Sequence, residues 1–430
     1  MQDASEALVD FATGLSLDAV PEAVLHRSKM SILDAIGTAL LSSELEKSRQ
    51  TARAVRGISA RGGSVAWGLG FRASPMEAAL LNGMLVEGLD YSDIHVGAGL
   101  HPTSVILPAV VSCGESDGSR GDEVMLAHVV GCETMIRLGL TAPGRFHARG
   151  FQPTSIVGVL GAAVATSKLM KLGRKETGEA LSLASTLAFG SSLSVRVGAY
   201  FGGVDSGRAA ESGLLASLLA REGIAGIARD SIEGRFGFLE TYAGQGNYDL
   251  RPVTQGLGKT WGMKEIFLKR YPTSYACTQL LDAALRLRKD SKIAPGDIAE
   301  VRFGASAPNI GLFSEPEEQK RRPATIYDAK TSHYFLLSLA LARGSISAES
   351  LLANLRDASV LELSDRVSYE LDEKSQWVEV KTRDGRVLRE TEDALVPTRE
   401  SAVRSKYREN SRRVIGEERT ARVENSPNSR

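Results

Sequence analysis

This chain of 430 residues contains few cysteines, namely Cys113, Cys132 and Cys277. Three thiolates cannot complete a four-cysteine zinc or iron–sulfur site, and their wide spacing matches no standard metal motif. They suit ordinary thiols in a reducing compartment. The low count therefore excludes a four-thiolate metal centre.

An excess of charge of one sign is also missing. Lys and Arg number 52, as do Asp and Glu, so the formal net charge is zero. Because dedicated nucleic-acid-binding proteins usually carry a basic excess, we expect no nucleic-acid partner. No apolar run reaches the roughly 18 residues of a membrane helix. The N-terminal stretch has no basic segment ahead of an apolar one. We therefore expect a cytoplasmic protein with no membrane partner.

The residues that are present divide the chain into two regions of different texture. Hydrophobic residues make up 43% of the chain, which is enough for a sizeable core. In the first 265 or so residues, segments such as 75–89, 121–140 and 154–173 are rich in Ala, Leu and small residues, which is typical of closely packed helices. This region predicts an all-helical domain over residues 1–264.

The second region mixes strand and helix patterns. Residues 298–306 and 367–391 alternate apolar and polar residues, and Asp384-Gly385 predicts a tight hairpin turn. A helical segment, 331–344, lies between them. We therefore expect an α+β lid domain over residues 265–391. Residues 392–410 are expected to pack back on the helical domain, and the charged tail 411–430 is expected to be disordered.

One loop concentrates reactive side chains. Asp90, Asp93, His95 and His101 lie within twelve residues, among glycines and ahead of Pro102. Loops on a rigid helical scaffold commonly display reactive groups, and this set favours acid–base chemistry. Two alternatives stay open. One is a divalent metal on Asp90, Asp93 and His95, whose spacing matches no standard metal loop, and the other is a plain solvated loop.

The same loop resembles a signature of the MmgE/PrpD family. Residues 89–95 and 101–111 (LDYSDIH…HPTSVILPAVV) are similar to the family pattern LDFDD…HPS. Further segments resemble family elements in the family's order: 150–155 (GFQPTS), 207–213 (GRAAESG), 269–272 (KRYP), 329–334 (AKTSHY) and 403–407 (VRSKY). Together the motifs span almost the whole chain, so the resemblance is strong although each motif alone is weak.

The resemblance implies a mainly α fold with an α+β second domain, and a site in the cleft between the two. It also implies a homodimer without metal, flavin or iron–sulfur cofactor. It places four residues at catalytic positions: Asp90, His101, Lys269 and Tyr334. Residues expected to bind substrate are Asp93, Gln152, Thr154, Ser155 and Arg208.

These residue types suit proton transfer next to a carboxylate. His101 is the expected base, and Asp90 can orient its ring. Lys269 and Tyr334 can stabilise the carbanion or enediolate that forms. Two bland alternatives remain, in which Tyr334 is a core aromatic residue and Lys269 a solvated lysine.

Departures from the family pattern bear on the substrate. Gln152 replaces the histidine of the family's GFHPTS element, and residues 202–207 lack the usual Lys and His. Ser92 replaces the second acid of the family's DFDD, and Ile94 replaces the usual Thr. Because glutamine donates a hydrogen bond but carries no charge, fewer cations are available. This favours a smaller or less charged substrate than citrate-like acids.

We therefore expect a cofactor-independent lyase that dehydrates or decarboxylates a small carboxylic acid. The family that the chain resembles includes 2-methylcitrate dehydratase, cis-aconitate decarboxylase and iminodisuccinate epimerase. An epimerase of the iminodisuccinate type is the first alternative, because it needs proton exchange but no leaving group. The second alternative is a relative that binds carboxylates without catalysis.

Overall fold

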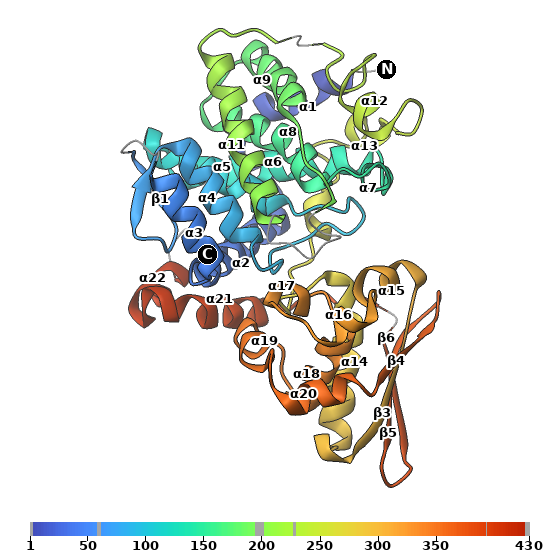
Figure 1. Cartoon of the computed structure of the whole chain (residues 1–430). Helices are drawn as coiled ribbons and strands as arrows, with labels where there is room; N and C mark the ends of the chain where they lie inside the picture. The colour runs from blue at the N-terminus through green and yellow to red at the C-terminus, as the bar shows by residue number, and fades with distance from the viewer. Residues whose placement is uncertain (1–2, 58–61, 194–201, 227–228, 393, 426–430) are drawn as a thin grey trace.

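The computed structural model describes residues 3–57, 62–193, 202–226, 229–392 and 394–425. Two bodies are visible in Figure 1, a larger helical one built from the N-terminal part of the chain and a smaller one that contains a sheet. Each has its own hydrophobic core. The fold is therefore mainly α with an α+β second domain, as the sequence predicts.

Helices build the first body. Their bounds are α1 (Ala4–Gly14), α2 (Glu22–Ser43), α3 (Glu46–Arg56), α4 (Pro75–Glu87), α5 (Pro102–Asp117), α6 (Gly121–Leu140), α7 (Arg145–Ala148), α8 (Pro153–Leu169), α9 (Arg174–Leu187), α11 (Gly202–Arg221), α12 (Phe238–Ala243) and α13 (Arg251–Thr254). A short antiparallel hairpin, β1 (Ser64–Ala66) and β2 (Phe71–Ala73), also belongs here. The domain expected to be all-helical therefore contains one small sheet.

Glycines let the central helices approach closely. A Cβ on Gly131 of α6 would lie 2.6 Å from the Cβ of Ala165 on α8. A Cβ on Gly83 of α4 would lie 2.7 Å from the Cα of Gly207 on α11. Side chains at these points would force the helices apart. Close helix packing thus explains Gly207, the first glycine of the GRAAESG segment, and no catalytic role is needed to account for it.

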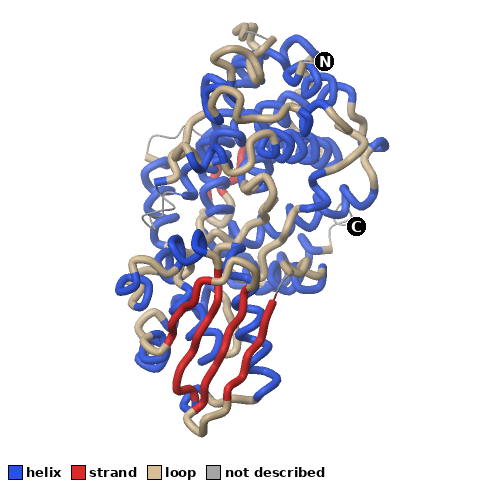
Figure 2. Tube along the Cα trace, turned by 90° about the vertical axis from the view of Figure 1, so that its right-hand side faces the viewer, coloured by secondary structure: helices blue, strands red, loops and turns tan. Residues whose placement is uncertain are grey.

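The second body is a four-stranded sheet with helices. Its elements are α14 (Thr278–Ser291), β3 (Ile298–Ala305), α15 (Ala307–Phe313), α16 (Glu317–Arg321), α17 (Ile326–Ala329), α18 (His333–Arg343), α19 (Ala348–Asn354), α20 (Ala358–Ser364), β4 (Val367–Leu371), β5 (Gln376–Thr382) and β6 (Val387–Glu392). The strand order is β4-β3-β5-β6, and only the β3–β4 pair is parallel. Figure 2 shows the strands side by side with helices behind them.

The C-terminal helices return to the first body. α21 (Glu400–Ile415) packs along α2, and its Val403 and Tyr407 join the larger core. A Cβ on Gly37 of α2 would lie 3.1 Å from the Cα of Tyr407, so the two helices touch closely.

The expectation of a disordered tail over residues 411–430 is wrong for most of its length. α21 continues to Ile415 and α22 covers Glu417–Glu424, while residues 426–430 lie outside the described part. Arg408 of α21 forms an ion pair with the buried Glu424 of α22, with 2.6 Å between Nε and Oε2, and so holds α22 in place. The many charged residues of the tail are therefore partly explained by ion pairs between packed helices.

Among the described residues, no helix on its own has the length and apolar character needed to cross a membrane. α18 and α19 meet that test only when taken together, as a pair bent by 99°.

Candidate functional site

The chain crosses between the two bodies beside the reactive loop. Ile94 and Phe267 form an antiparallel bridge, with N–H to carbonyl distances of 2.9 and 2.8 Å. This pairing brings the residues after Phe267 alongside the loop. As a result, Lys269 reaches back to Asp90, where its Nζ donates to the backbone carbonyl at 2.9 Å and to carboxylate Oδ1.

Asp90 is held in an unusual backbone conformation. Its φ is +52°, in the left-handed region that residues other than glycine seldom occupy. Its N–H donates to the carbonyl of Glu87 at 2.8 Å, and Lys269 binds its carbonyl. Burial opposes ionisation of the carboxyl, but Lys269, Lys330 and His101 outweigh it and lower the pKa of Asp90. Asp90 therefore stays a carboxylate.

His101 lies at the N-terminal end of α5 with a fixed tautomer. Its Nδ1 is 2.7 Å from the carbonyl oxygen of Asp93. Because a carbonyl only accepts, Nδ1 carries the proton and Nε2 keeps its lone pair. Nε2 lies 3.8 Å from Oε1 of Glu87 and 3.9 Å from Oδ1 of Asp90. The ring can thus take a proton at Nε2, and two carboxylates are placed to stabilise the imidazolium that results.

The sequence motifs did not predict two members of this cluster, Glu87 and Lys330. Glu87 ends α4, and its Oε2 accepts a hydrogen bond from Ser92 at 3.0 Å. Ser92 stands where the family pattern has an acid, so here it orients a carboxylate instead of supplying one. Lys330 follows α17 and interacts electrostatically with Asp90, Glu87 and Lys269. Burial lowers the pKa of Lys330, and the two carboxylates oppose that effect. It brings a second ammonium from the α+β domain.

The structure does not bring Tyr334 to this cluster. Its side chain is buried in the core of the second body, with 1% of its surface exposed. The guanidinium of Arg321 lies 4.1 Å from the centre of its ring. Burial raises the pKa of Tyr334, and the charges that act on it come from Glu317 and Arg321, not from the site. The placement matches the core-aromatic alternative.

The side chain of Asp93 faces the protein interior, where it is 1% exposed. Its Oδ2 accepts from Thr103 Oγ1 at 2.5 Å, and its Oδ1 accepts from the Thr103 N–H at 3.3 Å. Burial raises the pKa of Asp93 to about 6. Its side chain therefore anchors the first turn of α5, while its backbone carbonyl holds the His101 ring. The residue is placed to support the site from behind.

The beginning of α8 lies against His101. Thr154 Oγ1 accepts the backbone N–H of His101 at 3.1 Å. The next residue, Ser155, is fully buried and donates to the carbonyl of Phe189 at 2.6 Å. Gln152 is the N-cap residue of α8 and makes no capping hydrogen bond with its side chain. Arg208 lies on α11 with 46% of its side chain exposed and pairs with Glu211. Thr154 thus adjoins the cluster directly, and Arg208 does not.

The residues weighed as metal ligands separate into two groups. His95 accepts the Ala98 N–H at 3.0 Å and lies 3.6 Å from Glu265, apart from Asp93 and Asp90. Instead, ligand atoms of Glu87, Asp90 and His101 lie within 4.8 Å of one another. The ammonium of Lys269 already binds Asp90, and Lys330 adds a second positive charge. This charge pattern suits a bound carboxylate better than a divalent cation.

Fold and site together define a two-domain protein with an imidazole, two carboxylates and two lysines gathered where the chain crosses between its bodies. The MmgE/PrpD N-terminal domain matches residues 6–251, and the MmgE/PrpD C-terminal domain matches residues 271–426. The chain belongs to the MmgE/PrpD family.

Curated relatives cover nearly the whole chain. A cis-aconitate decarboxylase-like protein, oryM, of Aspergillus oryzae is 29% identical over 97% of this chain and 92% of its own length. The cis-aconitate decarboxylase of Aspergillus terreus is 27% identical over 96% and 90%, respectively. That of Mus musculus is 26% identical over 96% and 88%.

Proposed function

We propose that this protein is a lyase that acts on a small carboxylic acid, and that the reaction is a decarboxylation. One observation carries the proposal: Nε2 of His101 lies 3.8 Å from Glu87 and 3.9 Å from Asp90, where a proton on this nitrogen is stabilised, and the ammonium groups of Lys269 and Lys330 act on the same carboxylates. The names of the curated relatives support decarboxylation of a compound such as cis-aconitate.

In this reaction the C–C bond to one carboxylate breaks and carbon dioxide leaves. The electron pair of that bond stays on the substrate, and the resulting carbanion takes a proton from Nε2 of the protonated His101 ring. The ring regains a proton from water. Glu87 and Asp90, 3.8 and 3.9 Å from Nε2, stabilise the protonated ring before transfer.

Lys330 is the proposed partner of a substrate carboxylate that remains on the molecule. Lys269 is less suited to this task, because its ammonium already donates to the carbonyl and the carboxylate of Asp90. In addition, Lys269 is only 1% exposed. Lys269 therefore holds Asp90 in place, and Lys330, whose ammonium lies 5.7 Å from the centre of the Tyr327 ring, supplies positive charge to the substrate.

Gln152 is proposed to tune substrate choice. It lies two residues before Thr154, which binds the backbone of His101. A neutral amide can donate to a carboxylate but adds no charge. Together with the cations missing from residues 202–207, this favours acids that are smaller or less charged than citrate, so mono- and dicarboxylic acids are tested beside the tricarboxylate cis-aconitate.

A screen of small carboxylic acids, cis-aconitate first, tests this function. Each acid is incubated with the protein in deuterated water and followed by NMR, with carbon dioxide measured in parallel. Release of carbon dioxide supports the proposal. Loss of water or entry of deuterium into an otherwise unchanged acid would replace it by dehydration or epimerisation. Binding without turnover would point to a non-catalytic relative.

We also propose that the protein is a homodimer, that it is located in the cytoplasm, and that it turns over its substrate without an added cofactor. Sedimentation equilibrium measures the first property, and fractionation of the source cell measures the second. Dialysis against a chelator tests the third, since restoration of activity by a divalent metal would overturn it.

A further inference from the structure

Lys406 of α21 joins the two chain segments that carry the candidate site. Its Nζ lies 2.6 Å from the carbonyl oxygen of Tyr91 and 3.1 Å from that of Lys269. Its third partner is the carboxylate of Asp34 on α2, at 2.7 Å. The ammonium thus donates hydrogen bonds to the two carbonyl oxygens and forms an ion pair with the Asp34 carboxylate. The group also lies 3.5 Å from the centre of the Tyr91 ring.

The two carbonyls are not arbitrary points of the backbone. Tyr91 follows Asp90, whose φ of +52° must be enforced by its surroundings. Lys269 is the residue that binds the Asp90 carboxylate. Lys406 binds both carbonyls through one nitrogen and so links these segments a second time, in addition to the bridge between Ile94 and Phe267.

We propose that Lys406 is a positioning residue for the site, holding Asp90 and Lys269 in register from behind. The catalytic consequence rests on the proposed function, whereas the geometric consequence does not. The rival account is that Lys406 merely ties α21 to α2 through Asp34, which is 1% exposed.

A double variant separates the two accounts. Lys406→Met alone would leave the buried carboxylate of Asp34 without its partner and destabilise the fold. Asp34→Asn combined with Lys406→Met removes both charges and keeps the side-chain volumes similar. A merely structural ion pair can be replaced in this way, whereas the two carbonyl contacts cannot.

The matched control is another buried ion pair of the same domain. Arg137 pairs with Glu133 at 2.7 Å and donates to backbone carbonyls of the segment 252–260. Glu133→Gln combined with Arg137→Met removes a similar pair whose contacts do not include the candidate site. Both double variants are compared with the unmodified protein by crystallography, thermal unfolding and steady-state kinetics.

The proposal predicts that the Asp34/Lys406 variant folds but loses the contact between Asp90 and Lys269 or the left-handed φ of Asp90. Its kcat falls about a hundredfold, as expected when reacting groups are displaced by about 1 Å. The Glu133/Arg137 variant keeps the geometry of Asp90 and its kcat. An Asp34/Lys406 variant with unchanged Asp90 geometry and full kcat would overturn the proposal.

Lys406→Arg decides the question if the double variant does not fold. It keeps the charge opposite Asp34, but its planar group cannot reproduce the three-way contact of an ammonium. A lowered kcat with an unchanged melting temperature supports positioning, and an unchanged kcat overturns it. If the unmodified protein turns over no carboxylic acid, the proposed function fails, and the crystal structures alone decide whether Lys406 positions Asp90.

Discussion

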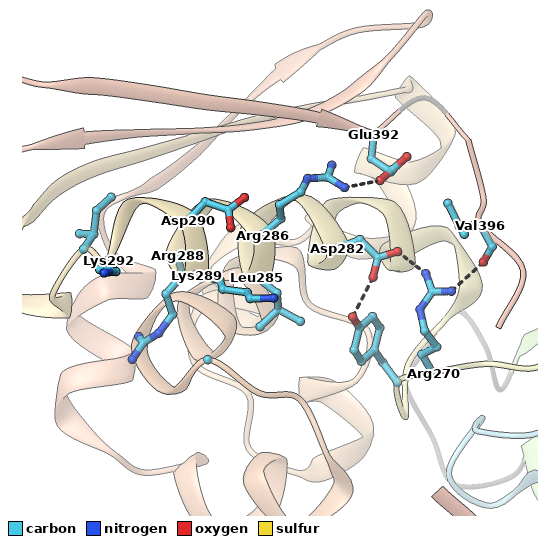
Figure 3. A pocket seen from close by; sticks show the side chains of 13 residues that line it. Arg270, Asp282, Leu285, Arg286, Arg288, Lys289, Asp290, Lys292, Glu392 and Val396 are labelled. Carbon is cyan, nitrogen blue, oxygen red and sulfur yellow. Dashed lines mark hydrogen bonds and ion pairs between the residues drawn. The ribbon is translucent and has the colours of Figure 1, made fainter. Parts of the chain in front are cut away.

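The side chains of two neighbouring residues, Lys269 and Arg270, contact two different regions of the molecule. Lys269 faces the junction of the domains, where it binds Asp90. Arg270 faces the other way and lines a cavity of 810 Å³ beside α14, where it binds Asp282 and the carbonyl of Val396 (Figure 3). Neither Asp90 nor His101 is among the residues that line this cavity.

The two regions differ in the exposure and in the pairing of their charged side chains. In the groove beside α14, Arg286 pairs with Glu392 at 3.0 Å (Figure 3), and it also pairs with Glu390 at 3.0 Å, on partly exposed side chains. Such pairs contribute about 0–1 kcal/mol each. At the junction, Lys269 is buried and Asp90 is strained. Strained backbone of this kind clusters at functional sites, so chemistry is expected at the junction.

Removing the imidazole should have the largest effect. His101→Ala is expected to lower kcat by about a hundredfold or more, because general acid–base groups contribute that much. The melting temperature should change little, since Thr154 still holds the backbone of residue 101. Steady-state kinetics and thermal unfolding measure both. A variant with near-normal turnover would remove His101 from the mechanism.

The buried carboxyl of Asp93 should make stability depend on pH. Its folded-state pKa, raised to about 6 by burial, exceeds its unfolded value of 3.8. The folded protein therefore binds the proton more tightly. The resulting stability is fully present at the acidic end, below the unfolded pKa, and is lost as the pH rises through 6.

Asp93→Asn removes this contribution, which amounts to at most about 3 kcal/mol. Denaturant unfolding at several pH values between 4 and 8 should show a smaller pH dependence for the variant than for the unmodified protein. Asp290→Asn in the exposed groove is the control and should leave the dependence as it is. Identical pH curves for the Asp93 variant and the unmodified protein would contradict this account.

Substitution of one lysine in each region, Lys330 at the junction and Lys289 in the groove beside α14, compares the two regions directly. Lys330→Met should lower kcat/KM about thirtyfold, because a hydrogen bond to a charged group is worth about 2 kcal/mol. Lys289→Met, in the groove beside α14, should leave kcat/KM unchanged. Kinetics on the same carboxylic acid compare the two. Equal effects of both substitutions would mean that Lys330 contacts no substrate.

The smallest effect is expected at Gln152. Gln152→Ala should raise KM about fivefold with little change in kcat, which corresponds to about 1 kcal/mol for a lost neutral hydrogen bond. The rival account is that Gln152 only packs at the start of α8. An unchanged KM with a lowered melting temperature would show that account to be right.

Local patterns in the sequence were enough to predict much of the fold. Alternation over residues 367–391 predicted β4, β5 and β6, and Gly385 adopts the positive φ that its turn requires. The tail was mispredicted because charged residues that pair across α21 and α22, such as Arg408 with Glu424, look the same in sequence as solvated ones.

The site was harder to predict, because it is assembled over long distances. Asp90, His101 and Lys269 stood in recognisable motifs. Glu87 and Lys330 end or follow helices and carry no periodic signal, and only the packing of the two domains brings them together. Tyr334 stood in a motif as well, but a motif does not say whether a buried aromatic residue faces a substrate or a core.

One NMR time course tests the central claim most directly. The protein is incubated with the acid that the substrate screen identifies, in deuterated water, beside the His101→Ala variant. The account predicts release of carbon dioxide and a product that carries one deuterium from solvent, with both processes lost together in the variant. Deuterium entry without loss of carbon dioxide, or product formation that survives His101→Ala, would contradict it.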